Sequence, residues 1–189
     1  ETGDPRSFAG YDELYAAFMK QVRYFVDMKV RVSNYIDRMF AKYAPATFLS
    51  LFIDDCIAKG RDYYNCGPRY NTTYIQCTGL GTITDSLSTL KKHIFEDKRW
   101  SMDELLKAMA NNFEGAEAMR QMILNRTPFF GNDDEYADSI AVKMFDDLYD
   151  TIEGKPNTKG ECFHLNMLST TCHVYFGKVM GATPNGRLA

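Results

Sequence analysis

Residues 69–92 read RYNTTYIQCTGLGTITDSLSTLKK, and the periodicity of their apolar side chains changes halfway along. The first part, NTTYIQ at 71–76, is rich in Thr, Tyr and Ile, which suit a half-buried strand. Gly79 and Gly81 follow, and because neither carries a Cβ the backbone can turn tightly there. The stretch therefore predicts a strand that ends in a glycine turn.

A helix is predicted to follow the glycine turn. Thr84 or Asp85 can accept a hydrogen bond from a free N–H group of the first helical turn. Apolar residues then recur at helical spacing, at positions 87, 90, 94 and 95. The strand, the turn and the helix form a βα unit over residues 69–96, and the rest of the chain is expected to cover and support it.

The region before this unit, residues 1–60, is predicted to be helical. Apolar residues at helical spacing indicate one long helix over roughly 11–42, and Pro45 cannot continue it. A second helix is expected over 48–58, because Gly60 can then supply its left-handed C-terminal cap.

The region 101–153 is also predicted to be helical. A Ser or Asn followed three residues later by Glu is typical of a capping box at a helix start, and two such pairs in this region precede apolar residues at helical spacing. The two boxes are Ser101 with Glu104 and Asn132 with Glu135; a short helix is expected over 116–124, and the last helix is expected to end near Gly154.

Residues 161–177 are predicted to be a strand region, interrupted near Ser169. Its second half, TTCHVYF at 170–176, is the second polar strand of the chain, and alternation places Thr171, His173 and Tyr175 on one face. A hydroxyl, an imidazole and a phenol on one face need water, a ligand or one another as partners. His173 beside Thr171 is therefore a candidate substrate contact, although a single strand histidine is more often a structural residue.

Composition and charge restrict the classes of protein that fit. A length of 189 residues favours one domain, and a net charge of -3 is too small to indicate a nucleic-acid partner. No run approaches the roughly 18 consecutive apolar residues of a membrane-spanning helix. The first residues, ETGDPRSF, lack the basic and apolar regions of a signal peptide, so a cytoplasmic location without a membrane partner is expected.

The side chains able to carry chemistry form no recognisable catalytic or metal-binding pattern. The five cysteines are odd in number and widely spaced, so free thiols are expected and neither zinc nor disulfides are indicated. The aspartates at 133, 134, 146, 147 and 150 lack the spacing of an EF-hand calcium loop and are expected on a solvated face. No set of nucleophile, base and orienting group is visible.

Four separated blocks resemble, in the same order, the pyruvate formate-lyase-like glycyl radical enzymes. They span nearly the whole chain, and four ordered blocks are far more specific than one motif. Asn185 stands where the family's T-P-D-G-R turn usually has Asp. The blocks are RYNTTYIQCTGLGTITDSLSTLKKHIF from Arg69, NNFEG from Asn111, NRTPFFGNDDEYAD from Asn125 and NMLSTTCHVYFGKVMGATPNGR from Asn166.

The resemblance implies a helix-rich α/β fold, namely a segment of the ten-stranded β/α barrel of the glycyl radical enzymes. In that family one loop carries the cysteine that becomes a thiyl radical, and another carries the glycine that stores the radical. No cysteine here has a Gly-Cys-x-Glu context, and no R-V-x-G-Y loop is present. Residues 1–189 are therefore expected to be a partial barrel domain that lacks both loops and is inactive alone. Thr171 matches a barrel-strand Thr expected to line the substrate pocket, with His173 nearby.

The resemblance also implies an activity. NTTYIQ and GLGTITDSL are most similar to the trans-4-hydroxy-L-proline dehydratases, which implies radical dehydration of that small molecule. An activating radical-SAM enzyme, which uses S-adenosylmethionine and an iron–sulfur cluster, is the implied partner that installs the glycyl radical. The full enzyme is expected to be a homo-oligomer, and no cofactor is expected to bind this segment directly.

Two alternatives stay open. The first is another lyase of the same family, such as a choline, diol or glycerol eliminase, or an enzyme of the formate acetyltransferase type. The second, from a different class, is a truncated module without catalytic activity that acts only through its fold or through association.

Overall fold

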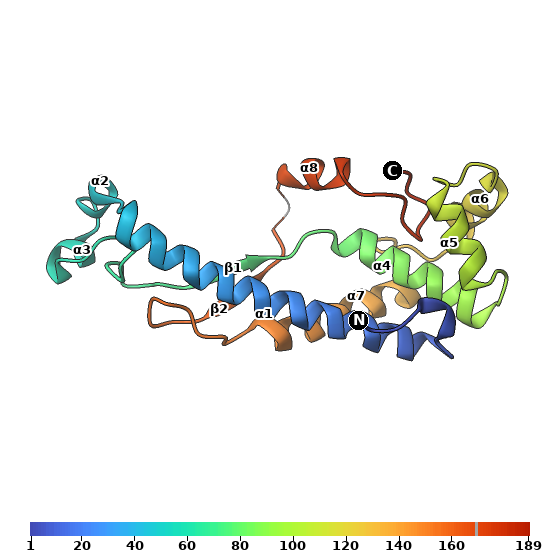
Figure 1. The fold of residues 1–189 in the computed structure, drawn as a ribbon, viewed down its shortest axis with the longest axis horizontal. Helices are drawn as coiled ribbons and strands as arrows, with labels where there is room; N and C mark the ends of the chain where they lie inside the picture. The colour runs from blue at the N-terminus through green and yellow to red at the C-terminus, as the bar shows by residue number, and fades with distance from the viewer. Residues whose placement is uncertain (169) are drawn as a thin grey trace. The chain divides into compact units, whose positions relative to one another are not determined.

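The computed structural model describes residues 1–168 and 170–189 and separates into two compact units. The boundary between the units falls inside two long helices, α1 (Tyr11–Tyr43) and α7 (Glu135–Ile152), which are labelled in Figure 1. The long helix predicted over 11–42 is confirmed. Unit 1 comprises residues 1–21, 77–147 and 167–189, and unit 2 comprises residues 22–76 and 148–166.

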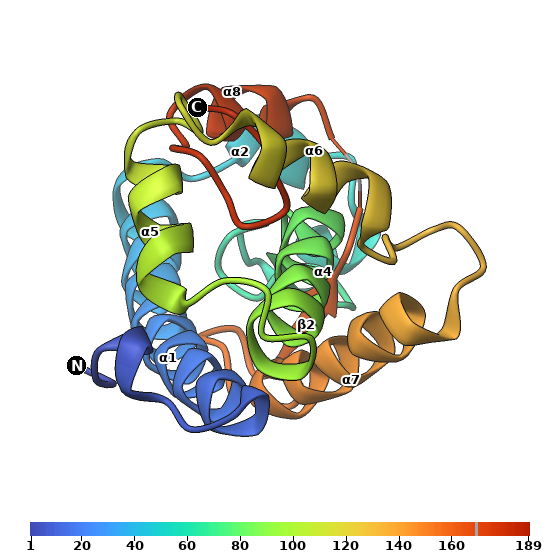
Figure 2. The same cartoon turned by 90° about the vertical axis from the view of Figure 1, so that its right-hand side faces the viewer.

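The regular elements in the described part of unit 1 are all helices. Figure 2 shows α4 in its interior, with α5, α6 and the first turns of α7 about it. None of the described helices is long and apolar enough to cross a membrane. The elements that lie wholly in unit 1 are a 3-10 turn η1 (Pro5–Ser7), α4 (Leu80–Thr89), the π-helix η2 (Leu90–Glu96), α5 (Met102–Ala110), α6 (Glu117–Arg126) and α8 (Cys172–Lys178).

The glycine turn is present, but the helix after it starts earlier than predicted. Gly79 has a left-handed backbone with φ 82°, and its carbonyl accepts the Ile83 N–H at 2.9 Å, so α4 begins at Leu80. The expected cap at Thr84 or Asp85 is therefore wrong, and Thr84 is fully buried inside the helix. Gly79 itself makes the cap, because a residue without a Cβ adopts the left-handed region at little cost.

Capping differs between the two predicted boxes. The Ser101 box of α5 is confirmed: the Ser101 hydroxyl accepts from the Glu104 N–H, and the Glu104 carboxylate accepts from the Ser101 N–H. The box predicted at Asn132 is wrong, because the Asp134 carboxylate caps α7 by accepting the Tyr136 N–H at 3.0 Å. Asp134 directly precedes the helix, the position from which a short carboxylate reaches the first free N–H groups.

The core of unit 1 is formed by the inward faces of its helices. Leu105 and Met144 are each 1% exposed, and Ile123 and Ala137 are completely buried. The other buried apolar residues of this unit are Leu14, Tyr15, Met19, Leu87, Leu90, Ile94, Met102, Ala108, Phe113, Ile140 and Ala141.

In unit 2 the helix expected over 48–58 is instead two short helices, α2 (Thr47–Ser50) and α3 (Asp54–Lys59). Ile53 between them is extended, with φ -117° and ψ 110°, which interrupts the helical ladder. The Ser50 hydroxyl, at the end of α2, bonds the Asp62 carboxylate and the Tyr63 N–H and so anchors the following loop. Gly60 caps α3 in the left-handed region, as predicted.

Unit 2 also contains the two described strands, β1 (Thr73–Gln76) and β2 (Phe163–Asn166), which pair in parallel (Figure 1). The register places Thr73 opposite Phe163 and continues residue by residue. Ile75 and Phe163 are buried, so one side of this small sheet contributes to the core of the unit. The strand predicted over 71–76 is thus confirmed at Thr73–Gln76, and the strand region predicted over 161–177 is confirmed at Phe163–Asn166.

Candidate functional site

The second predicted polar strand, residues 170–176, is a helix in the structure, which corrects the sequence prediction. The N–H groups of His173 and Val174 donate to the carbonyls of Thr170 and Thr171, at 3.3 and 3.2 Å, and α8 follows. The run has strand-forming residues but no strand partner within residues 1–168 and 170–189, so local turn bonds satisfy its backbone. The interruption expected near Ser169 lies outside the described residues.

Thr171 and His173, the predicted substrate contacts, therefore do not share a strand face. Residues two apart on a helix point to different sides. Thr171 is exposed at the start of α8, whereas the His173 Nε2 atom is buried without a hydrogen-bond partner among the described residues. Their role in substrate binding remains a prediction.

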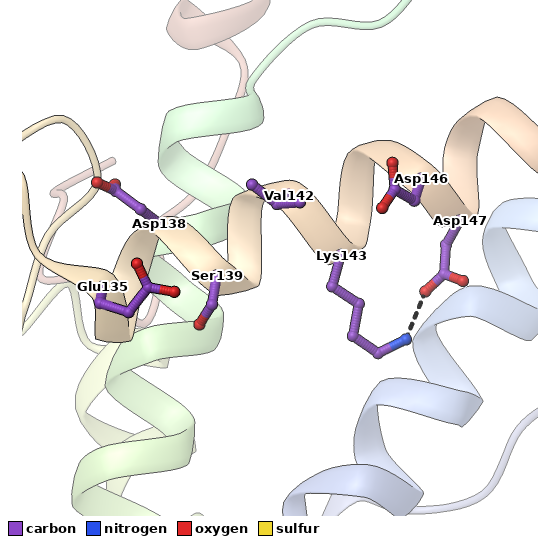
Figure 3. Close-up of a pocket in the computed structure, with 7 residues that line it drawn as sticks. All are labelled: Glu135, Asp138, Ser139, Val142, Lys143, Asp146 and Asp147. Atoms are coloured by element: carbon purple, nitrogen blue, oxygen red, sulfur yellow. Dashed lines mark hydrogen bonds and ion pairs between the residues drawn. The ribbon is translucent and has the colours of Figure 1, made fainter.

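A groove of about 430 Å³ lies along α7 in unit 1, and Figure 3 shows its lining. The Lys143 ammonium pairs with Asp147 Oδ2 at 2.8 Å, and the Tyr15 hydroxyl donates to the same oxygen at 2.6 Å. No group of acidic, His or Cys side chains in the described residues is arranged to hold a metal ion. The groove is lined by Glu135, Asp138, Ser139, Val142, Lys143, Asp146 and Asp147.

The acidic residues of this helix behave largely as the sequence predicted. Asp133, Asp146 and Asp150 are exposed, and Asp134 and Asp147 have the cap and ion-pair roles described above. The carboxylates therefore face solvent or bind neighbouring groups of the same unit, and they form no paired acid and base.

A compact polar cluster in unit 2 combines a thiol, an imidazole and a carboxylate. The Cys162 Sγ atom lies 3.5 Å from the Nε2 atom of His164, and the other ring nitrogen of His164 pairs with the Glu153 carboxylate. Cys162 and His164 are two residues apart at the start of β2, so their side chains point to the same side of the strand. All three side chains are partly accessible to solvent.

A local hairpin brings Glu153 opposite His164. The chain leaves α7 at Ile152, and the N–H of Gly154 donates to the Phe163 carbonyl at 3.2 Å. The N–H of Phe163 returns a bond to the Lys155 carbonyl at 2.7 Å. Gly154 has φ 76°, a left-handed conformation that lets the chain turn directly after the helix.

Two further contacts fix the Glu153–His164 pair, one to the carboxylate and one to the imidazole. The Leu165 N–H donates to the second oxygen of Glu153 at 3.4 Å, which fixes the carboxylate. Tyr74, the residue paired with His164 across the two strands, places its ring 5.7 Å from the imidazole. Nucleophile, base and orienting group thus share one site, although the sequence showed no such set.

Part of this cluster could have been found from the sequence. Cys-x-His at the start of a strand places thiol and imidazole on one face, and the strand itself was predicted. Glu153 could not have been assigned, because its position opposite His164 depends on the hairpin in which residues 154–156 fold back onto residues 162 and 163.

The turn at 182–187, part of the last sequence block, is anchored inside unit 1. The Asn185 side chain accepts from the Thr183 hydroxyl at 2.6 Å, and the Arg120 side chain donates to the Gly186 carbonyl at 2.7 Å. Burial raises the pKa of Asp85, which accepts the Phe130 N–H and hydrogen bonds with Asn185. A neutral amide at 185 can donate to Asp85, whereas a second carboxylate there would repel it.

The chain is similar in sequence to known enzymes over its whole length. The pyruvate formate lyase-like family model matches residues 1–177. The chain is 50% identical over 188 residues to trans-4-hydroxy-L-proline dehydratase of Clostridioides difficile, covering 100% of this chain and 24% of that protein. It is 36% identical to isethionate sulfite-lyase of Oleidesulfovibrio alaskensis, again over 100% of this chain and 23% of the relative.

Solved structures agree with the sequence matches. The crystal structure of the C. difficile hydroxyproline dehydratase with trans-4-hydroxy-L-proline bound superposes with a TM-score of 0.94, covering 100% of this chain and 24% of that one. A glycyl radical enzyme from Archaeoglobus fulgidus superposes with a TM-score of 0.85 at 31% identity, covering 94% of this chain and 23% of that one.

The predicted fold class, a helix-rich α/β segment of the glycyl radical enzyme type, is confirmed by these superpositions. The chain spans about a quarter of the length of the relatives it matches. Since the family model covers all but the last residues and the identities extend over the whole chain, this chain belongs to the pyruvate formate lyase-like family.

Proposed function

We propose that the full-length protein carrying this chain is a glycyl radical dehydratase that removes water from trans-4-hydroxy-L-proline. The observation that carries the proposal is the 50% identity, over the whole chain, to a dehydratase named for that substrate. The sulfite-lyase relative, by contrast, shares 36%. Side chains of this segment are thus more similar to those of the hydroxyproline enzyme than to those of an enzyme named for a sulfonate.

The proposed radical chemistry requires groups that these residues do not supply. None of the five cysteines lies in a Gly-Cys-x-Glu sequence, and all five are free thiols. We therefore assign the radical-bearing cysteine and glycine, and the attack on substrate, to other residues of the full protein. This segment would supply support for the barrel and part of the wall of the substrate pocket.

Thr171 and His173 are the proposed substrate contacts within this segment. The His173 ring nitrogen that has no partner in the described part of the chain can bond a ligand, since buried polar atoms are normally paired. Thr171 offers a hydroxyl that both donates and accepts, which suits a substrate with carboxylate, amine and hydroxyl groups.

The proposed partner is an activating enzyme that uses S-adenosylmethionine and an iron–sulfur cluster to form the glycyl radical. A homo-oligomeric enzyme in the cytoplasm completes the proposal. Support for the activating enzyme comes from membership of the family and from the glycyl radical relative.

The decisive experiment assays the full-length protein anaerobically after activation. We expect trans-4-hydroxy-L-proline to be converted to a product lighter by one water, measured by mass spectrometry, with no conversion when the activating enzyme is omitted. Proline, which lacks the leaving hydroxyl, is the matched control substrate. Loss of substrate without activation, or no loss after a glycyl radical has been detected by electron paramagnetic resonance, would contradict the proposal.

A second candidate is carbon–sulfur cleavage, favoured by the 36% identity to isethionate sulfite-lyase. Isethionate belongs in the same activated assay, with release of sulfite as the readout. Sulfite release without dehydration of hydroxyproline would assign the second activity in place of the first.

A further inference from the structure

We propose that Cys162 is a reactive thiol, a modification site for small electrophiles of the α,β-unsaturated carbonyl class. The proposal rests on the cluster of Cys162, His164 and Glu153 and is independent of the proposed dehydratase activity. A thiol becomes strongly nucleophilic only as the thiolate, so a neighbouring base decides its reactivity.

The imidazole of His164 is placed to take the thiol proton. Its Nε2 atom lies 3.5 Å from the Cys162 sulfur, within hydrogen-bonding range for sulfur. An ionised carboxylate only accepts hydrogen bonds, so Glu153 requires the proton of the neutral ring to sit on Nδ1. That tautomer leaves the Nε2 lone pair directed to Cys162.

Glu153 then acts as the orienting group for the base. One carboxylate oxygen binds the ring and the other accepts the Leu165 N–H at 3.4 Å, so the carboxylate is fixed by backbone as well as by imidazole. The carboxylate can also accept a hydrogen bond from the imidazolium that forms when the thiol proton is taken. The set of thiol, imidazole and carboxylate has the order required of an activated nucleophile.

The backbone around Cys162 is held on both sides. Its carbonyl accepts the Thr73 N–H at 3.1 Å, and Pro156 pairs with it as an isolated antiparallel bridge. Within this segment the thiol is accessible, because Cys162 is only half-buried and the neighbouring Tyr74 is 59% exposed. A small planar electrophile can therefore approach a sulfur whose position is fixed.

Addition to an α,β-unsaturated carbonyl compound needs only the one proton that the Cys162 thiol supplies and His164 can carry. The thiol proton moves to His164 Nε2, and the sulfur forms a bond to the β-carbon while the carbon–carbon π electrons shift to the α-carbon. The imidazolium then returns its proton to the α-carbon and gives a neutral thioether. No oxidant, reductant or leaving group is needed, so the reaction balances with the electrophile alone.

N-ethylmaleimide, a reagent of this class, tests the proposal on the intact, reduced full-length protein. Brief labelling followed by peptide mass spectrometry gives a rate constant for each cysteine. Cys66 is the matched internal control, since it is also half-buried in unit 2 and no hydrogen bond joins it to an imidazole in the described chain. We expect Cys162 to react about tenfold or more faster than Cys66.

Two variants separate the base from the orienting group. His164→Gln should lower the Cys162 rate about tenfold while leaving the Cys66 rate unchanged, and Glu153→Gln should lower it less, because the amide keeps an acceptor oxygen. Asp150→Asn removes an exposed carboxylate near the end of α7, just before Glu153, and should leave the Cys162 rate unchanged. Equal rates at Cys162 and Cys66, or a Cys162 rate that stays or rises in His164→Gln, would overturn the proposal.

Discussion

Thr171 is a residue that the sequence identified as a candidate substrate contact, although the sequence did not predict the helix that follows it. The last sequence block predicted Thr171 and His173 on one face of a strand, whereas the structure places them at the start of α8. Thr171 is exposed, and the adjacent Thr170 hydroxyl lies 2.6 Å from the Cys172 sulfur. The two neighbouring threonines therefore differ in whether their hydroxyl has a partner within the segment.

This difference gives a matched pair of variants. Thr171→Ala should raise KM for trans-4-hydroxy-L-proline about tenfold, the expected effect of losing one hydrogen bond worth about 1–1.5 kcal/mol, whereas Thr170→Ala should change KM less than twofold. The measurement is steady-state kinetics of the activated full-length protein. A larger KM effect at Thr170 than at Thr171 would remove Thr171 from the substrate pocket.

Among elements, the π-helix η2 is the feature that the amphipathic pattern did not distinguish from an ordinary helix. The N–H of Asp97 donates to the Lys92 carbonyl at 2.8 Å, the wider spacing of a π turn. Within it His93 is fully buried, with Nε2 3.0 Å from the Thr127 hydroxyl and its ring 5.4 Å from that of Trp100. η2 therefore holds a titratable group inside the core of unit 1.

Acid should destabilise η2 through His93. Burial, with Arg99 and Lys92 nearby, lowers the pKa of His93, and Asp97 only partly opposes this. Because the unfolded imidazole binds a proton near its ordinary pKa of 6.5, the stability contributed by neutral His93 is present above that pH. It is lost as the pH falls through the lower folded pKa.

The measurement is hydrogen exchange of the η2 amides, corrected for intrinsic rates, in the full-length protein from about pH 7.5 to about pH 5.5. Protection should fall with acidification, and His93→Gln, which keeps a hydrogen-bonding group but does not titrate, should flatten the pH dependence. Equal slopes in the variant and the parent protein would exclude His93 as the cause.

On the scale of the whole molecule, large apolar side chains of unit 2 are exposed to solvent. The rings of Phe48 and Phe52 contact each other at 5.0 Å between centroids and are 76% and 71% exposed. In the described sheet β1 has β2 as its one neighbouring strand, so the outer edge of β1 has no strand partner. Exposed apolar groups and open strand edges both favour association.

The polypeptide of residues 1–189 should therefore self-associate when it is made without the remaining sequence of its relatives. Sedimentation velocity should show the mean mass rising with concentration. Replacing Phe48 and Phe52 together by Lys should reduce the association, whereas Lys at the exposed polar position Ser139 should not. A single monomeric species at all concentrations would contradict the prediction.

Local signals in the sequence were sufficient for much of the fold. The long helix, the strand over 71–76, the Ser101 box and the left-handed glycines at 60 and 79 depend on periodicity, capping and backbone freedom within a few residues. The ordered blocks from 69 to 187 were likewise sufficient for the family and its fold class. These features need no knowledge of distant contacts.

Tertiary structure decided the features that depend on contacts between residues distant in the sequence. TTCHVYF has the composition of a strand but lacks a neighbouring strand in the described chain, so it forms α8. The site of Cys162, His164 and Glu153 required the hairpin after α7 and the parallel register with β1. Sequence alone determined the family and those elements that depend on local or shared patterns. The cluster arises only when the backbone folds back and brings separate residues within hydrogen-bond range.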